Sequence, residues 1–163
     1  MPAINDNLIL ISGASSTGKS ASLLNLKTPE GVMYLNTESN KKLPFKSKFK
    51  EFSIVDPLQI FEAFTKAEEM KDIHTIVIDS LTFLMDAYET MYVINSANTM
   101  KAWQDFAQFF KTLMQQHVAN STKNVIFIAH TLTTLNEADM VMETKVPIKG
   151  ALKIMEWKDI LVP

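Results

Sequence analysis

The stretch that decides the fold is Gly13-Ala14-Ser15-Ser16-Thr17-Gly18-Lys19-Ser20. It matches the pattern G-x-x-x-x-G-K-[ST] in full, and the apolar run Leu8-Ile9-Leu10-Ile11 just before it is typical of a buried strand. Glycines allow the backbone to curl until consecutive N–H groups point at phosphate oxygens. The segment from Gly13 to Ala21 is therefore predicted to cradle the phosphates of a nucleotide, between a strand and a short helix over about residues 19–26.

Three residues of the chain are predicted to act on the triphosphate and its magnesium ion. Lys19 is expected to bridge the β- and γ-phosphates, and the Ser20 hydroxyl is expected to bind Mg²⁺. Asp79 ends the apolar run Ile76-Val77-Ile78, which is the Walker B pattern of a second Mg²⁺ ligand. The alternative for Asp79 is a strand-end aspartate that caps the next turn.

Two further polar residues end predicted strands and are candidates for the chemistry. Glu38 follows the strand at 32–35, where a carboxylate can activate the attacking water. His130 ends the strand at 125–129, where an imidazole can hydrogen-bond the γ-phosphate and respond to its loss. A solvated loop glutamate and a structural histidine are the alternatives for these two residues.

Apolar periodicity predicts strands and helices in alternation. Strands are expected at 8–11, 32–35, 52–55, 75–78 and 125–129, and helices at 57–70 and 99–119. Residues 81–98 remain ambiguous between helix and loop, and residues 131–149 are predicted to form a mobile loop. The fold class is therefore α/β, a P-loop NTPase with a mainly parallel central sheet flanked by helices, and residues 1–163 are expected to form a single nucleotide-binding domain.

Composition limits the classes of function. The chain has 163 residues, a net charge of −2, no cysteine and no basic start typical of a signal peptide, so we expect a cytoplasmic protein. All sixteen cationic residues are lysine, which excludes any mechanism that needs an arginine of this chain. That absence argues against a small-molecule P-loop kinase with an arginine-rich lid and against an AAA+ motor with an arginine finger. A GTPase is disfavoured because no Asn-Lys-x-Asp motif is present.

In order along the chain, these motifs resemble the RecA-like ATPases. The matching positions are Gly13 to Ser20, Glu38, Ile76 to Ser80 and Ile126 to His130. The sequence is most similar to short phage-encoded RecA-like proteins of recombination and single-strand annealing, on account of Asp79-Ser80-Leu81-Thr82 and the strand end Ala129-His130. The sensor is histidine where RecA has glutamine. The chain ends at Pro163, before strands that a full recombinase core contains, which leaves open a minimal protein or a piece of a longer one.

The resemblance implies a RecA-like core that hydrolyses Mg-ATP, acts on single-stranded DNA and forms a homo-oligomer. It implies that Phe45 stacks on adenine, that residues 131–149 contact DNA, and that a neighbouring subunit contributes a cation to the γ-phosphate. The candidates for DNA contact or for that cation are Lys145, Lys149 and Lys153. A non-enzymatic module, in which ATP only switches assembly, remains the main alternative.

A basic segment leaves a second interpretation open. It contains two aromatic residues among five lysines: Phe45 and Phe49, with Lys41, Lys42, Lys46, Lys48 and Lys50. Such interleaving can grip single-stranded nucleic acid, although a solvated lysine loop is the simpler interpretation. Phe45 cannot stack on both adenine and a DNA base, so at least one of its two assignments has to fail.

Overall fold

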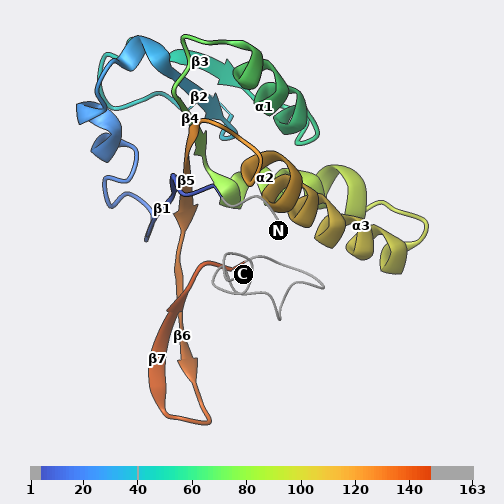
Figure 1. The fold of residues 1–163 in the computed structure, drawn as a ribbon. Helices are drawn as coiled ribbons and strands as arrows, with labels where there is room; N and C mark the ends of the chain where they lie inside the picture. Colours follow the sequence, from blue (N-terminus) through green and yellow to red (C-terminus); the bar gives the residue numbers. More distant parts are fainter. Residues whose placement is uncertain (1–4, 40, 148–163) are drawn as a thin grey trace.

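The computed structural model describes residues 5–39 and 41–147, and its central feature is a five-stranded sheet (Figure 1). All strands in this sheet are parallel, in the order β1-β5-β4-β2-β3. A second sheet is the antiparallel pair β6 and β7. The elements are, in chain order, β1 (Leu8–Gly13), η1 (Ala21–Asn25), η2 (Pro29–Gly31), β2 (Val32–Asn36), β3 (Lys50–Ser53), α1 (Gln59–Glu69), β4 (Thr75–Asp79), α2 (Leu81–Tyr88), η3 (Glu89–Val93), α3 (Thr99–Thr112), η4 (Leu113–Val118), β5 (Asn124–His130), β6 (Leu132–Asn136) and β7 (Val141–Lys145).

The two faces of the sheet bury different side chains, because residues alternate between faces along each strand. One face carries Met33, Leu35, Ile76 and Phe127 against helices α1, α2 and α3. The opposite face carries Val32, Tyr34, Val77, Ile126 and Ile128, and it is covered by Leu23 of η1 and by the segment 43–49. The predicted α/β fold with a parallel central sheet flanked by helices is confirmed.

Strand order places the predicted site residues at one edge of the sheet. Parallel strands direct their carboxyl ends to the same edge, where ligands of open α/β sheets bind. Gly13 at the end of β1 is level with His130 at the end of β5, and Asn36 at the end of β2 is level with Asp79 at the end of β4. The sheet thus brings together residues that are far apart in the sequence.

Several local predictions need correction. The helix expected over about 19–26 is only the five-residue 3-10 helix η1, since Thr28-Pro29 follows within three residues of its end and Pro29 begins η2. The strand expected at 52–55 lies at Lys50–Ser53. The helix expected from residue 57 begins at Gln59, because Asp56 instead accepts a 2.9 Å bond from the Leu58 amide in the preceding turn. The ambiguous stretch 81–98 contains helix α2 and the π-helix η3.

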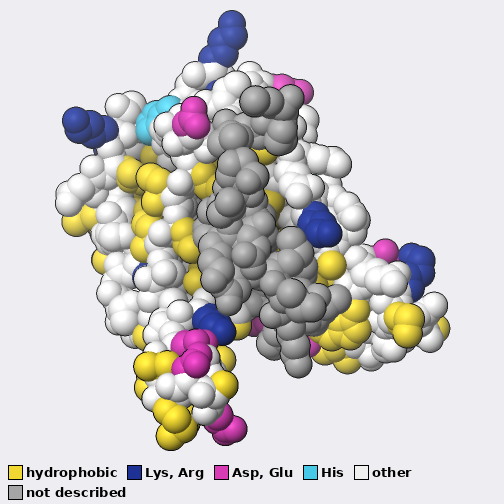
Figure 2. Space-filling view, turned by 60° about the horizontal axis from the view of Figure 1, so that its bottom comes forward, with side chains coloured by type: hydrophobic (Ala, Val, Ile, Leu, Met, Phe, Trp, Pro, Cys, Tyr) yellow, Lys and Arg dark blue, Asp and Glu magenta, His cyan; other side chains and the backbone are white. Residues whose placement is uncertain are grey.

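The stretch predicted as a mobile loop after His130 is a β-hairpin in its described part. Strands β6 and β7 pair Leu135 with Met142, and the turn is closed by Asn136, whose side chain accepts bonds from the amides of Ala138 and Asp139. The hairpin extends away from the body of the molecule (Figure 1) and carries apolar side chains on its surface (Figure 2). The loop prediction failed because it tested only for a helical stripe.

Candidate nucleotide-binding site

The loop from Gly13 to Ser20 is shaped by two residues with positive φ. Gly18 has φ of 86° and Ser16 has φ of 61°, a region that glycine enters without steric cost. A Cβ atom on Gly13 would lie 2.9 Å from Thr17 Oγ1, so the loop also folds tightly against its own first residue. Glycine is therefore required at the two positions for different reasons. Gly13 leaves no space for a side chain, and Gly18 has a backbone conformation that other residues rarely adopt.

Lys19 lies against the loop that it follows, with only 9% of its surface exposed. Its Nζ donates to the carbonyl oxygens of Gly13 at 3.0 Å and Ala14 at 2.6 Å. Burial lowers the pKa of Lys19, and the nearby Lys41 ammonium lowers it further, while Asp79 and Glu38 oppose the shift. A cation held by neutral carbonyls in a partly buried site can exchange them for phosphate oxygens.

Asp79 is fully buried at the end of β4, and its carboxylate is hydrogen-bonded on both oxygens. Oδ2 accepts 2.6 Å bonds from the hydroxyls of Ser20 and Tyr34, and Oδ1 accepts a 2.9 Å bond from Lys41 Nζ. Burial and the bond to Asp79 raise the pKa of Tyr34. A serine hydroxyl next to a carboxylate is the donor set that fits Mg²⁺, which prefers oxygen ligands and takes the others from water and phosphates.

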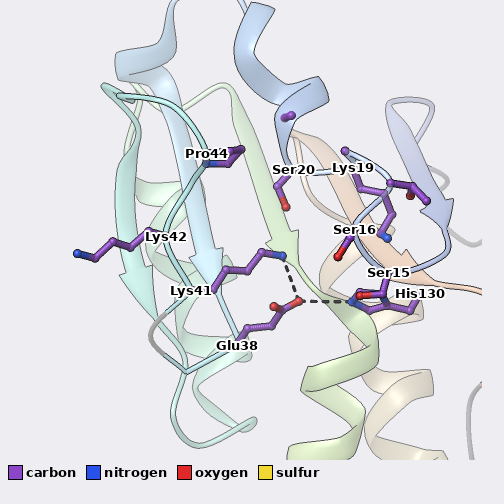
Figure 3. Close-up of a pocket in the computed structure, with 12 residues that line it drawn as sticks. Ser15, Ser16, Lys19, Ser20, Glu38, Lys41, Lys42, Pro44 and His130 are labelled. Carbon is purple, nitrogen blue, oxygen red and sulfur yellow. Dashed lines mark hydrogen bonds and ion pairs between the residues drawn. The ribbon is translucent and has the colours of Figure 1, made fainter.

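Glu38 and His130 face each other across the pocket (Figure 3). Glu38 Oε1 lies 3.5 Å from His130 Nε2 and 3.1 Å from Lys41 Nζ. The turn that carries Glu38 is fixed by Asn36, whose side chain accepts from the Glu38 amide at 2.9 Å and donates to the Lys41 carbonyl at 2.8 Å. The two residues predicted to act on the γ-phosphate are thus close together.

His130 also connects the pocket to the rest of the fold. Its amide donates to Thr82 Oγ1 of α2 at 2.9 Å, and its ring contacts Phe83 edge-on at 5.7 Å between centroids. Leu132 begins β6 only two residues later. The residue that faces Glu38 in the pocket is therefore separated from the hairpin by Thr131 alone.

These residues line a pocket of about 330 Å³. Its lining consists of Ser15, Ser16, Thr17, Gly18, Lys19, Ser20, Ala21, Glu38, Lys41, Lys42, Pro44 and His130. Of the predicted nucleotide contacts, Gly13, Ala14 and Phe45 are not in this lining, and Asp79 lies beneath Ser20. Lys145 lies in β7, where it pairs with Glu143 at 2.8 Å, and the predicted contacts Lys149 and Lys153 lie outside the described residues.

The basic segment packs onto the fold instead of forming a free loop. Phe45 contacts Phe49 edge-on at 5.9 Å between centroids, and Phe49 stacks on Tyr34 at 6.2 Å. Phe45 is therefore partly buried against the core under the sheet, and its neighbour Pro44 lines the pocket. Stacking of Phe45 on adenine stays a prediction.

The sequence prediction missed Lys41 and Tyr34 as parts of the site. Lys41 was assigned to a basic surface segment, although it lies three residues after Glu38, a spacing at which two side chains can meet in a turn. For Tyr34, the sequence predicts a place in a strand and no role in the site. Its role follows from the pairing of β2 with β4, which no short motif records.

A family model described as an AAA domain matches residues 5–162, which is nearly the whole chain. The chain belongs to the AAA domain family. Membership in this family makes the protein a P-loop ATPase by class, with ATP as its nucleotide. The AAA domain of this chain contains no arginine, so it cannot provide the arginine finger of an AAA+ motor.

A solved structure of the pCW3 conjugation coupling protein TcpA, in its monomer form with ATPγS, is similar at a TM-score of 0.46 and 15% identity. The match covers 76% of this AAA domain protein and 42% of the TcpA chain. No curated protein sequence matches the chain. Among residues 5–39 and 41–147, no helix is both long and apolar enough to cross a bilayer.

Proposed function

We propose that this AAA domain protein hydrolyses ATP in the pocket at the carboxyl edge of its sheet. The observation that supports it best is the convergence of Glu38 and His130 with the phosphate loop in one pocket. The β-phosphate would lie on the loop amides and Lys19, and Ser20 and Asp79 would hold the Mg²⁺ ion, which neutralises charge on the phosphates.

Glu38 is the proposed general base. A water molecule held by its carboxylate attacks the γ-phosphorus, the bond from that phosphorus to the bridging oxygen of ADP breaks, and the proton of the water passes to Glu38. His130, 3.5 Å from the same carboxylate, is placed to hydrogen-bond the γ-phosphate and to lose that bond when phosphate leaves. ADP, inorganic phosphate and a proton are the products.

Phosphate release from the purified protein tests this function. We expect release of phosphate from ATP that depends on Mg²⁺ and needs no small-molecule acceptor. Changing Asp79 to Asn should weaken Mg²⁺-dependent binding, so that phosphate release no longer responds to Mg²⁺ at the concentrations that suffice for the parent protein. Consumption of ATP only with an added acceptor would indicate a kinase. Stoichiometric ATP binding without phosphate release would favour an ATP-dependent assembly switch.

We further propose that the ligand controlled by ATP is single-stranded DNA, in recombination or annealing of the phage RecA-like type. This part of the proposal rests on the resemblance of the motifs and on the direct connection from His130 into the β6–β7 hairpin. The charges limit how the hairpin can act: Glu137, Asp139 and Glu143 outnumber Lys145. We therefore expect modest affinity, with help from other lysines.

The basic segment supplies only part of that help. Lys48 pairs with Glu30 at 3.4 Å, Lys50 pairs with Asp72, and Lys41 is held inside the pocket. Lys42 and Lys46 are exposed and have no ion pair with any residue in the described ranges. They are the lysines of this segment that remain available to a nucleic-acid backbone.

A titration of single-stranded DNA with ATP, with ADP and without nucleotide tests the DNA proposal. We expect the tightest binding with ATP and weaker binding as salt rises, because displaced counterions drive it. Changing Lys145 and Lys149 together to Ala should weaken DNA binding while ATP affinity stays near normal. If the parent protein binds no DNA at low salt with ATP, under conditions where it assembles, the DNA proposal fails and the nucleotide-switch interpretation replaces it.

A further inference from the structure

Lys41 is a cation inside the pocket to which the proposed reaction gives no task. Its Nζ lies 2.9 Å from Asp79 Oδ1 and 3.1 Å from Glu38 Oε1, and a quarter of its side chain is exposed. These two carboxylates are the ones expected to serve the metal ion and the attacking water. The ammonium group therefore lies between these two carboxylates.

Two hydrogen bonds hold the backbone of Lys41 near the end of β2. Its carbonyl accepts from Asn36 Nδ2 at 2.8 Å, and its amide donates to the Glu38 carbonyl at 3.2 Å. Both bonds tie residue 41 to the end of β2. The four-carbon stem of lysine can still swing its ammonium group between partners that lie a few ångströms apart.

The other cations of the pocket are less suited to the γ-phosphate. Three lysines line the pocket: Lys19, Lys41 and Lys42. Lys19 lies on the carbonyls of the phosphate loop, and Lys42 points away from the loop in Figure 3. The chain has no arginine that a second copy could insert. Besides Lys19, the lysine of this pocket that is best placed to bind the triphosphate is therefore Lys41.

We propose that Lys41 binds the γ-phosphate of ATP, and that its ion pairs with Glu38 and Asp79 hold it in place until ATP enters. The inference rests on the proposed hydrolytic function of the site. When the ammonium group moves to the γ-phosphate, Glu38 Oε1 becomes free to accept a hydrogen bond from water. ADP has no γ-phosphate, so with ADP the ammonium group stays on the two carboxylates.

The test compares the affinity for AMP-PNP, a non-hydrolysable ATP analogue, with that for ADP, both with Mg²⁺. The Lys41→Met variant keeps the stem of the side chain and removes the charge. We expect its preference for AMP-PNP over ADP to fall about tenfold or more, the size of one hydrogen bond between charged groups. The Lys48→Met variant removes the same charge from the same segment outside the pocket and should keep the preference of the parent protein.

Two further variants keep the test decisive. Lys41→Arg keeps a cation and should retain most of the preference. Lys41→Gln serves if the methionine variant does not fold, because its amide can still donate to the carboxylates; it has no charge and should lose the preference. An unchanged ratio of the two affinities in Lys41→Met or Lys41→Gln would overturn the proposal. This measurement involves no turnover, so it is separate from phosphate release, whose absence would instead overturn the proposed function.

Discussion

At the scale of single residues, the site is organised around Asp79. A carboxylate with no exposed surface has to be compensated by hydrogen bonds or charge, and Ser20, Tyr34 and Lys41 provide both. Of these three, only Tyr34 is itself buried in the core, where Mg²⁺ and nucleotide would not displace it. Tyr34 is therefore the partner of Asp79 that we expect to keep its bond when nucleotide binds.

Changing Tyr34 to Phe should lower the free energy of unfolding of the nucleotide-free protein by about 1–3 kcal/mol, because a buried charge loses a hydrogen bond. Urea unfolding measures this change. The matched control is Tyr92→Phe, which removes another 2.6 Å hydroxyl–carboxylate bond, to Asp56, at a half-buried position. We expect a smaller loss there, because water can replace the lost hydrogen bond. Equal losses in both variants would show that Tyr34 does not hold Asp79.

Lys19 gives the second prediction at this scale. Changing Lys19 to Ala should abolish ATP binding, since the phosphates lose their main cation, while the fold is retained. The partners that the lysine leaves behind are the carbonyls of Gly13 and Ala14, which neighbouring water can reach. Calorimetric titration with ATP measures the loss, and circular dichroism checks the fold. ATP binding like that of the parent protein would mean that the nucleotide lies elsewhere.

At the scale of elements, helices α1 and η4 meet through stacked rings. His117 of η4 lies on Phe61 of α1, with ring centroids 4.6 Å apart and an interplanar angle of 19°. Burial lowers the pKa of His117. Its folded pKa is thus below the unfolded value of about 6.5, so the folded state binds this proton less readily than the unfolded chain does.

It follows that His117 makes stability fall on acidification. Its contribution is present above the unfolded pKa and is lost as the pH falls through the folded pKa. Changing His117 to Phe keeps the ring stack and removes the titration, so the variant should lose less free energy of unfolding than the parent protein between about pH 7.5 and pH 5. Urea unfolding at each pH provides the comparison. Parallel pH profiles for the two proteins would contradict the assignment.

At the scale of the whole molecule, the fold could be predicted further than the site. The phosphate loop and the apolar runs around Ile9, Val77 and Phe127 predict these strands, because each signal lies within a few residues of sequence; the run at Ile9 was expected to be buried, but it forms the edge strand β1, where Ile9 is 51% exposed. The hairpin after His130 was missed, since its strands are defined by pairs such as Leu135 with Met142. Lys41 and Tyr34 were missed for the same reason, because their shared partner Asp79 meets them only in space.

The two possible sources of a γ-phosphate cation make different predictions for assemblies. If Lys41 acts within its own subunit, mixing Lys19→Ala subunits with Lys41→Met subunits should give no more phosphate release than the two variants give separately. If a neighbour supplies the cation, as the resemblance implies for Lys149 or Lys153, mixing Lys19→Ala with Lys149→Ala subunits should restore part of the activity. Gain of activity in the first mixture would contradict a role of Lys41 within its own subunit.

The rate of the first turnover in the Glu38→Gln variant shows whether Glu38 is the general base for ATP hydrolysis. Protein loaded with ATP in the absence of Mg²⁺ is started by adding Mg²⁺, and cleaved phosphate is followed in time. With ATP bound as in the parent protein, we expect a first turnover slower by about 10²-fold, because the general base is lost. A first turnover as fast as that of the parent protein would contradict this role of Glu38.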